Sequence, residues 1–221
     1  QLEAANLFLV PLDDERRWYR YHHLFADFLR TELEKESQAA LHLKAARWLA
    51  AHDLLPEAVK HALASGDMNE AARVITLAAE GPSIASFVTF LGWLNALPDE
   101  LVRGDGELAT YKGILLFMTR QYAEAATYAD AAERSLSPDA PLPSRGRLLS
   151  LRAQLALGND TLDSAIQLSK EALDCLSDAF FRSLTLSVQG QALQMQGDIA
   201  AAADVYRDAV LAGRQAGNQL G

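Results

Sequence analysis

The segment Gly66-Asp-Met-Asn-Glu-Ala-Ala72 decides the fold, because three related segments follow it along the chain. They read Arg120-Gln-Tyr-Ala-Glu-Ala-Ala126, Asp160-Thr-Leu-Asp-Ser-Ala-Ile166 and Gly197-Asp-Ile-Ala-Ala-Ala-Ala203. Each segment follows a break in a helical pattern and opens a new run of helix-forming residues. Self-similarity of this kind is typical of repeat proteins, so the chain is predicted to consist of repeated units.

The spacing of these segments predicts the kind of unit. Their matching alanines are 54, 40 and 37 residues apart. Helix-pair repeats span about 34 residues in tetratricopeptide (TPR) units and roughly 40 to 47 in longer families, so the first interval is expected to hold an irregular pair. Small residues on either side of the alanines let antiparallel helices approach closely, which predicts a right-handed superhelix of TPR-like antiparallel helix pairs. The alanines are Ala71, Ala125, Ala165 and Ala202, and the flanking small residues are Gly113, Ala153, Gly190, Ala132, Ala172 and Ala209.

Composition favours helices along most of the chain. Half of the 221 residues are apolar, and Ala, Leu, Glu, Gln and Arg dominate over β-branched residues. A packed core and an all-α class follow. The exception is the N-terminal end, where residues 6–12 and 18–21 flank a polar turn and predict a short β-hairpin. An amphipathic helix from His22 to about Glu36 is expected to support this hairpin.

Charge and cysteine usage limit the classes of function. The net charge of −9 opposes attraction to phosphate backbones, so this piece is not expected to bind nucleic acid. A single cysteine, Cys175, excludes an intrachain disulfide and fits a reducing cytoplasm. No apolar run approaches the roughly 18 to 20 residues of a membrane span, and the residues that follow Gln1 lack the charged-then-apolar pattern of a signal peptide. The missing initiator Met predicts a piece of a longer protein.

Common catalytic and metal-binding signatures are absent from the sequence. It contains no phosphate loop, no His-Glu-x-x-His, no nucleophile elbow and no Gly-x-Gly-x-x-Gly, so we predict that it is not an enzyme. His22, His23 and Asp27 supply too few convergent ligands for zinc, so no metal site is predicted either. Trp48 and Trp93 fall at apolar helix positions and are expected in the core.

A long stretch near the N-terminus resembles the end of the winged-helix segment in MalT-type, ATP-dependent LuxR-family transcription regulators. It reads Leu9-Val-Pro-Leu-Asp-Asp-Glu-Arg-Arg-Trp-Tyr-Arg-Tyr-His-His-Leu-Phe-Ala-Asp-Phe-Leu-Arg30. Four later segments are also similar to that family in order and spacing, namely Ala45 to Leu49, Glu57 to Leu63, Gly66 to Val74 and Trp93 to Pro98. Residues 137–221 match it only as generic TPR-like repeats.

This resemblance implies a domain order. Such regulators carry a signal-transduction ATPase, then the winged helix, then a superhelical sensor, then a DNA-binding helix-turn-helix. The chain would hold the middle, with the ATPase outside it. We expect the end of the winged-helix segment at residues 1–36, helical connector pairs at 37–100, and TPR-like superhelical sensor repeats, truncated at their C-terminal end, at 101–221.

The resemblance also implies a nucleotide sensor. Tyr21-His22-His23 stands where related ATPases carry a Met-His-Asp-like motif, whose histidine touches the β-phosphate of bound ADP. His22 is therefore the candidate sensor in the parent protein, although His23 replaces the acid of that motif. A surface or capping role is the alternative. The fragment itself is expected to hold no cofactor, and ATP or ADP would bind in the parent.

The concave wall of the superhelix is the remaining place for function. A polar stripe on the first helix of each pair is expected to face inward, where it can hydrogen-bond a polar ligand or a peptide backbone. A solvated helix face would look the same in the sequence. The candidate ligand-binding residues are Thr110, Ile114, Arg147, Ser150, Gln154, Ser187, Gln191 and Gln194.

Together these patterns predict a signal-sensing and protein-interaction fragment that binds a small-molecule inducer or a regulatory protein. The resemblance implies coupling to ADP/ATP-controlled oligomerisation and transcription activation, with self-association in the parent. The alternative is a TPR-like scaffold that binds a peptide and no small molecule. We expect a cytoplasmic protein without membrane contact.

Overall fold

Helices dominate the structure, a computed structural model that describes residues 8–15, 19–32, 35–80 and 87–219. The predicted all-α class with one N-terminal hairpin is confirmed. The strands are β1 (Leu9–Pro11) and β2 (Tyr19–Tyr21). The helices are α1 (His23–Glu32), α2 (Lys35–Ala51), α3 (Leu55–Ser65), α4 (Met68–Glu80), α5 (Phe87–Ala96), α6 (Asp99–Gly104), α7 (Gly106–Met118), α8 (Tyr122–Ser135), α9 (Leu142–Gly158), α10 (Leu162–Cys175), α11 (Ala179–Gln196) and α12 (Ile199–Gln219).

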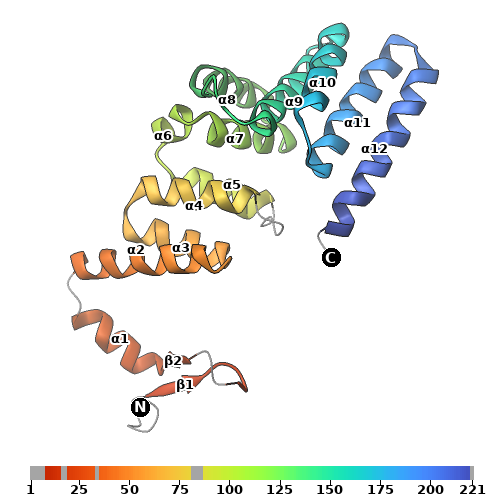
Figure 1. The fold of residues 1–221 in the computed structure, drawn as a ribbon. Helices are drawn as coiled ribbons and strands as arrows, with labels where there is room; N and C mark the ends of the chain where they lie inside the picture. The colour runs from red at the N-terminus through yellow and green to blue at the C-terminus, as the bar shows by residue number, and fades with distance from the viewer. Residues whose placement is uncertain (1–7, 16–18, 33–34, 81–86, 220–221) are drawn as a thin grey trace.

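The helices stack in an arc that runs from the hairpin at one end to α12 at the other (Figure 1). Tight turns join α2 to α3, α7 to α8, α9 to α10 and α11 to α12, and the two helices of each pair pack along each other. The predicted architecture of stacked, TPR-like helix pairs is therefore confirmed. Two short helices, α5 and α6, stand between α4 and α7 and account for the long first interval.

Each of the four repeated segments begins with a residue in the left-handed backbone region. The φ angles are 78° at Gly66, 64° at Arg120, 57° at Asp160 and 91° at Gly197. This conformation ends one helix and lets the next one fold back. Glycine adopts it readily, whereas other residues do so at a cost of about 1–2 kcal/mol. The repeats therefore share a turn geometry and not a glycine.

The close helix approaches predicted from small residues are present. A Cβ atom on Gly113 would lie 2.6 Å from Cδ2 of Leu151, and one on Gly190 would lie 2.8 Å from the Tyr206 ring. Ala153, at the matching position of α9, is fully buried. A larger side chain at this position would push neighbouring helices apart.

The hairpin leans on α1, as expected for a two-stranded sheet. β1 and β2 pair antiparallel, and the Phe25 ring of α1 lies 5.1 Å from Phe8 and 5.4 Å from Tyr21 between ring centroids. Residues 6–7 and Trp18, also expected in the strands, lie outside the described residues. Aromatic packing thus joins the hairpin to the helical part.

A continuous apolar core runs from α2 to α11. Trp93 packs against it as expected. The prediction for Trp48 is wrong: its side chain is 48% exposed and stacks on His52 at 3.9 Å. Helix α2 instead turns Ala46, Leu49 and Ala50 toward the core. In the described ranges, none of the helices combines the length and apolarity needed to cross a bilayer.

Candidate functional site

Five of the eight candidate ligand-binding residues are buried. Ser187, Gln191 and Gln194 on α11 are exposed. The eight side chains therefore do not share one open lining, and that expectation is corrected. The exposed fractions of the buried five are 2% for Thr110, 4% for Ile114, 8% for Arg147, 0% for Ser150 and 2% for Gln154.

The stripe is buried because each first helix is covered by the next first helix. The Ser150 hydroxyl on α9 is hydrogen-bonded to the Thr185 hydroxyl on α11 at 2.7 Å, and both side chains are fully buried. On α11 the matching residues Ser187 and Gln191 remain accessible. The polar stripe is thus the seam between repeats on α7 and α9, whereas on α11 Ser187 and Gln191 are exposed.

Arg147 ties three successive first helices together. Its guanidinium carbon lies 5.1 Å from the Tyr111 ring centroid on α7 and 5.8 Å from that of Phe181 on α11. Its Nη2 donates to Ser144 Oγ at 3.3 Å, and the Ser144 hydroxyl donates to the Glu107 carboxylate of α7. Hydrogen bonds and ring faces compensate the buried charge. These contacts explain how the charged Arg147 side chain can be buried without a bound ligand.

Gln154 has no such explanation. Its Nε2 atom is buried and has no hydrogen-bond partner within the described part of the chain. A buried donor left unsatisfied costs about 1–3 kcal/mol. We therefore expect the amide of Gln154 to lower the stability of the seam.

An apolar cavity of about 30 Å³ lies among α4, α5, α7 and α11. Phe87 of α5 and Phe180 of α11 meet here, with ring centroids 6.1 Å apart. Sequence reasoning missed this site because its walls come from elements far apart in the chain. The lining residues are Ala79, Phe87, Phe90, Tyr111, Ile114, Leu115, Phe180 and Phe181.

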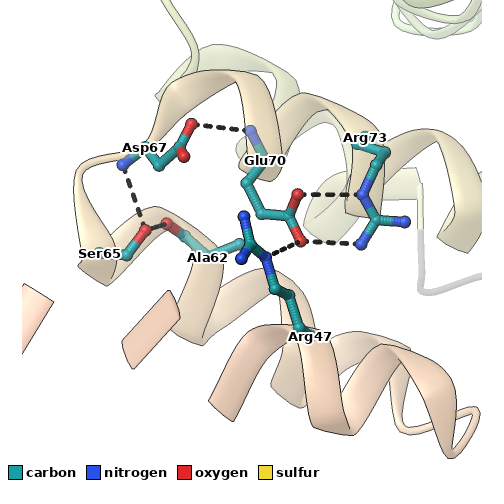
Figure 2. Close-up of polar contacts among 6 residues, drawn as sticks. All are labelled: Arg47, Ala62, Ser65, Asp67, Glu70 and Arg73. Atoms are coloured by element: carbon teal, nitrogen blue, oxygen red, sulfur yellow. Dashed lines mark hydrogen bonds and ion pairs between the residues drawn. The ribbon is translucent and has the colours of Figure 1, made fainter. Parts of the chain in front are cut away.

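A second missed site surrounds the Glu70 carboxylate where α2, α3 and α4 meet (Figure 2). Arg73 donates to both carboxylate oxygens, from Nε at 3.0 Å and from Nη2 at 2.8 Å. Nε of Arg47 on α2 lies 3.5 Å from the same carboxylate. The hydrogen bonds from Arg73 lower the pKa of Glu70, and burial partly opposes them. The cluster exposes two cations around one largely buried acid.

The turn before α4 fixes the position of Glu70. The Ser65 hydroxyl donates to Ala62 O at 2.6 Å and accepts from the Asp67 backbone N–H at 3.1 Å. Asp67 Oδ1 in turn accepts the backbone N–H of Glu70 at 3.0 Å, which caps α4 (Figure 2). The signal in the sequence was the Ser-Gly-Asp run followed by a glutamate.

Arg73 also faces an open pocket of about 620 Å³ between α4 and the α6–α7 junction. Asn69, Thr76 and Asp105 supply its other polar groups. The Asp105 side chain is committed to capping α7, because it accepts from the backbone N–H groups of Glu107 and Leu108. The pocket therefore offers mixed polar contacts and no concentrated charge.

His22 lines a pocket of about 460 Å³ between the hairpin and α1. Its ring centroid is 4.3 Å from that of His23, and Arg20 lines the same pocket. An arginine with two imidazoles is a suitable chemistry for an anionic group. In the described residues, no group of three or more His, Cys, Asp or Glu side chains is arranged to hold a metal ion. The nucleotide-sensing role of His22 stays a prediction.

Comparison with known proteins bears on the identity of this chain. Residues 1–41 match the MalT winged helix domain. The chain is 31% identical over 221 residues to the HTH-type transcriptional regulator MalT of Cronobacter sakazakii, and 31% identical over 205 residues to that of Klebsiella pneumoniae strain 342. These alignments cover 97% and 90% of the chain, so the resemblance extends through the helical repeats.

The chain spans about a quarter of the length of these relatives, 24% and 23% respectively. No solved structure gave a significant match. The resemblance to MalT-type regulators expected from the sequence is confirmed by these alignments.

Proposed function

We propose that this chain, which resembles MalT-type regulators over nearly its whole length, is the signal-sensing and protein-interaction part of such a transcription regulator. The observation that carries the proposal is the extent of the similarity. It continues from the winged-helix match at residues 1–41 across 97% of the chain. The stacked helix pairs of that region form an extended surface suited to recognition.

The proposed contact surface for an inducer or a regulatory protein is the open end of the polar seam on α11. Ser187, Gln191 and Gln194 are exposed there and carry hydroxyl and amide groups. Such groups can bond a polar ligand or a peptide backbone. Arg147, Ser150, Gln154, Thr110 and Ile114 would support this surface from within the stack.

The proposed coupling runs from the repeats to the hairpin. ADP or ATP would bind in the parent, and the Arg20, His22 and His23 pocket would contact its phosphates from the winged-helix side. Ligand binding would then favour an oligomerising, transcription-activating state over a closed one. The ATP-binding region, the DNA-binding element and the self-association surface belong, in this proposal, to parts of the parent outside these residues.

Thermal-shift screening of the 221-residue chain against small metabolites tests the sensor role. A ligand at 100 times its Kd stabilises the folded state by about 2.7 kcal/mol. A ligand that uses the α11 surface should lose this effect in the Ser187→Ala/Gln191→Ala variant. If no metabolite stabilises the chain, a small-molecule sensor in these residues is ruled out by that screen.

The alternative function is a TPR-like protein-binding scaffold without a small-molecule ligand. The burial of Arg147, Ser150 and Gln154 favours it, because their polar groups do not line an open groove. A scaffold would be stabilised by a peptide or protein partner and not by metabolites. A cytoplasmic location is proposed for either function, because the single cysteine fits a reducing compartment.

A further inference from the structure

Two histidines face each other between helices α2 and α3. His42 on α2 and His61 on α3 have their Nδ1 atoms 2.8 Å apart, with ring centroids separated by 4.9 Å. Both side chains are half-buried. Ala58 and Ala62, which flank His61 on α3, are completely buried against α2 and its neighbours, so the packing of the pair holds the two rings in place.

The chemistry of this contact depends on protons. A hydrogen bond between two imidazole nitrogens needs one donor and one acceptor. A neutral pair satisfies this through its tautomers, and a singly protonated pair does so with a charge-assisted bond. A doubly protonated pair would direct two N–H groups and two positive charges at each other across 2.8 Å, so it must separate.

The surroundings oppose the second proton further. The pKa of His61 is lowered from its ordinary value, first by burial, then by the charge of His42 and then by that of Lys60. These two groups, from α2 and from α3 itself, are the charges that act on His61. On the α4 side of the layer, Glu70 pairs with both Arg73 and Arg47, and these groups do not contribute to this shift.

We infer that the His42–His61 pair is a pH-sensitive clasp between α2 and α3, closed at neutral pH and released when both rings are protonated. The clasp stands at the joint between the winged-helix match, which ends at residue 41, and the helix pairs beyond it. Acidification would therefore loosen the connection between the hairpin end and the repeats. This inference concerns α2 and α3 alone and does not rest on the proposed sensor role.

The sign of the effect follows from proton counts. The open state can hold two protons on the pair, whereas the closed state holds at most one. Below pH 6.5, the ordinary pKa of histidine, the equilibrium constant for opening should therefore rise by up to about tenfold for each unit by which the pH falls. Above that pH both states are neutral and the opening equilibrium is flat.

Hydrogen exchange of α2 and α3 amides in the 221-residue chain, corrected for intrinsic rates, measures this opening between pH 8 and pH 5. The wild type should open increasingly below pH 6.5. His61→Asn and His42→Asn, which keep a polar group near the Nδ1 position but cannot be charged, should flatten the profile. The matched control is His52→Asn, because His52 lies at the end of the same pair and its Nδ1 contacts Trp48 O at 2.7 Å instead of another imidazole.

The inference is overturned if the wild type and both asparagine variants share one pH profile, or if His52→Asn alone removes it. If one variant fails to fold, the other is used in its place, because each removes one of the two rings that must be protonated for the clasp to open. A direct readout is the NMR titration of the His61 ring in the wild type. It should shift toward its ordinary range in His42→Asn, and an unchanged midpoint would also count against the clasp.

Discussion

The hydroxyl groups of Thr185 and Ser150 lie 2.7 Å apart across the boundary between two successive first helices, with both side chains fully buried. This contact shows that the polar stripe of one first helix is covered by the next. A stripe that reads as a solvent-facing groove in the sequence is therefore a polar interface between repeats. Its members should respond to substitution according to burial and not according to residue type.

Gln154 and Gln191, which occupy matching positions, should respond differently to the same change. Gln154→Met removes a buried amide whose Nε2 finds no partner in the described residues, so it should stabilise the fold by about 1 kcal/mol. Gln191→Met on the exposed face should change stability by less than about 0.5 kcal/mol. Urea unfolding followed by circular dichroism measures both. A large loss on Gln154→Met would show that the amide makes a necessary bond.

Gly106→Ala should be strongly destabilising. An added Cβ would lie 2.5 Å from the backbone Cα of Leu136, which cannot move as a side chain can. Overpacking of this kind costs about 1–3 kcal/mol and occasionally more. Gly158→Ala is the control, because nothing lies within 4 Å of its added Cβ. The melting temperatures should separate the two variants clearly, and equal values would mean that α7 and the α8 end can part without cost.

Arg120→Gly should raise stability although it removes a side chain. Arg120 sits at φ 64°, which strains a residue with a Cβ. Relief of that strain stabilises the folded state, and the greater flexibility of glycine in the unfolded chain offsets part of the gain. The free energy of unfolding should rise by about 0.5–1 kcal/mol. Gly197→Ala, at φ 91°, should lower stability by a similar amount. Chemical denaturation of the two variants side by side checks the opposite signs.

Glu70→Gln should destabilise the α2–α4 layer in a pH-dependent manner. The pKa of Glu70 is lowered below its ordinary 4.5, chiefly by the Arg73 hydrogen bonds. Its stabilisation is therefore present above pH 4.5 and lost as the pH falls through the folded-state pKa. We expect a loss of about 1 kcal/mol at pH 7, limited by the exposed arginines.

The control for Glu70→Gln is Glu124→Gln, because Glu124 holds the same place in the second repeated segment and is exposed. The stability difference between wild type and Glu70→Gln should shrink in acid, measured by thermal unfolding from pH 7 to pH 3. A difference that stays constant over this range would assign the effect to packing.

His22→Ala tests the nucleotide proposal in the full-length parent. His22 lines the hairpin pocket with Arg20 and His23, so its loss should weaken ADP binding and raise basal transcription activation. Calorimetric titration with ADP and a reporter assay measure the two effects. Unchanged ADP affinity would remove His22 from the switch, and Asp27→Asn, on the exposed side of α1, serves as a neighbouring control.

The repeat architecture could be predicted because it depends on local features. The register of Ala71, Ala125, Ala165 and Ala202 identified four turns, and each proved to have the same left-handed geometry. Burial of the seam could not be predicted in the same way. Whether Ser150 faces solvent or a neighbour depends on the angle between successive helix pairs, which no single helix specifies.

The remaining sites depend on contacts that the pattern of one segment does not contain. Glu70 reads as an ordinary surface acid until Arg47 of another helix is placed beside it. Trp48 reads as core because it is apolar, yet smaller residues of α2 occupy the inner face. Tertiary context decided both cases.

The contact between Phe87 and Phe180 alters how the stack should unfold. In a simple solenoid each unit touches only its neighbours, so stability behaves like a one-dimensional chain of nearest-neighbour terms and the ends fray first. Helix α5 instead meets α11 across the intervening α7–α10 pairs, with the two rings 6.1 Å apart. Such a bridge closes a loop, so that melting of the last pair releases a contact with the connector. Loss of order in the last pair would then reach α5, in the middle of the arc, as part of the same cooperative step.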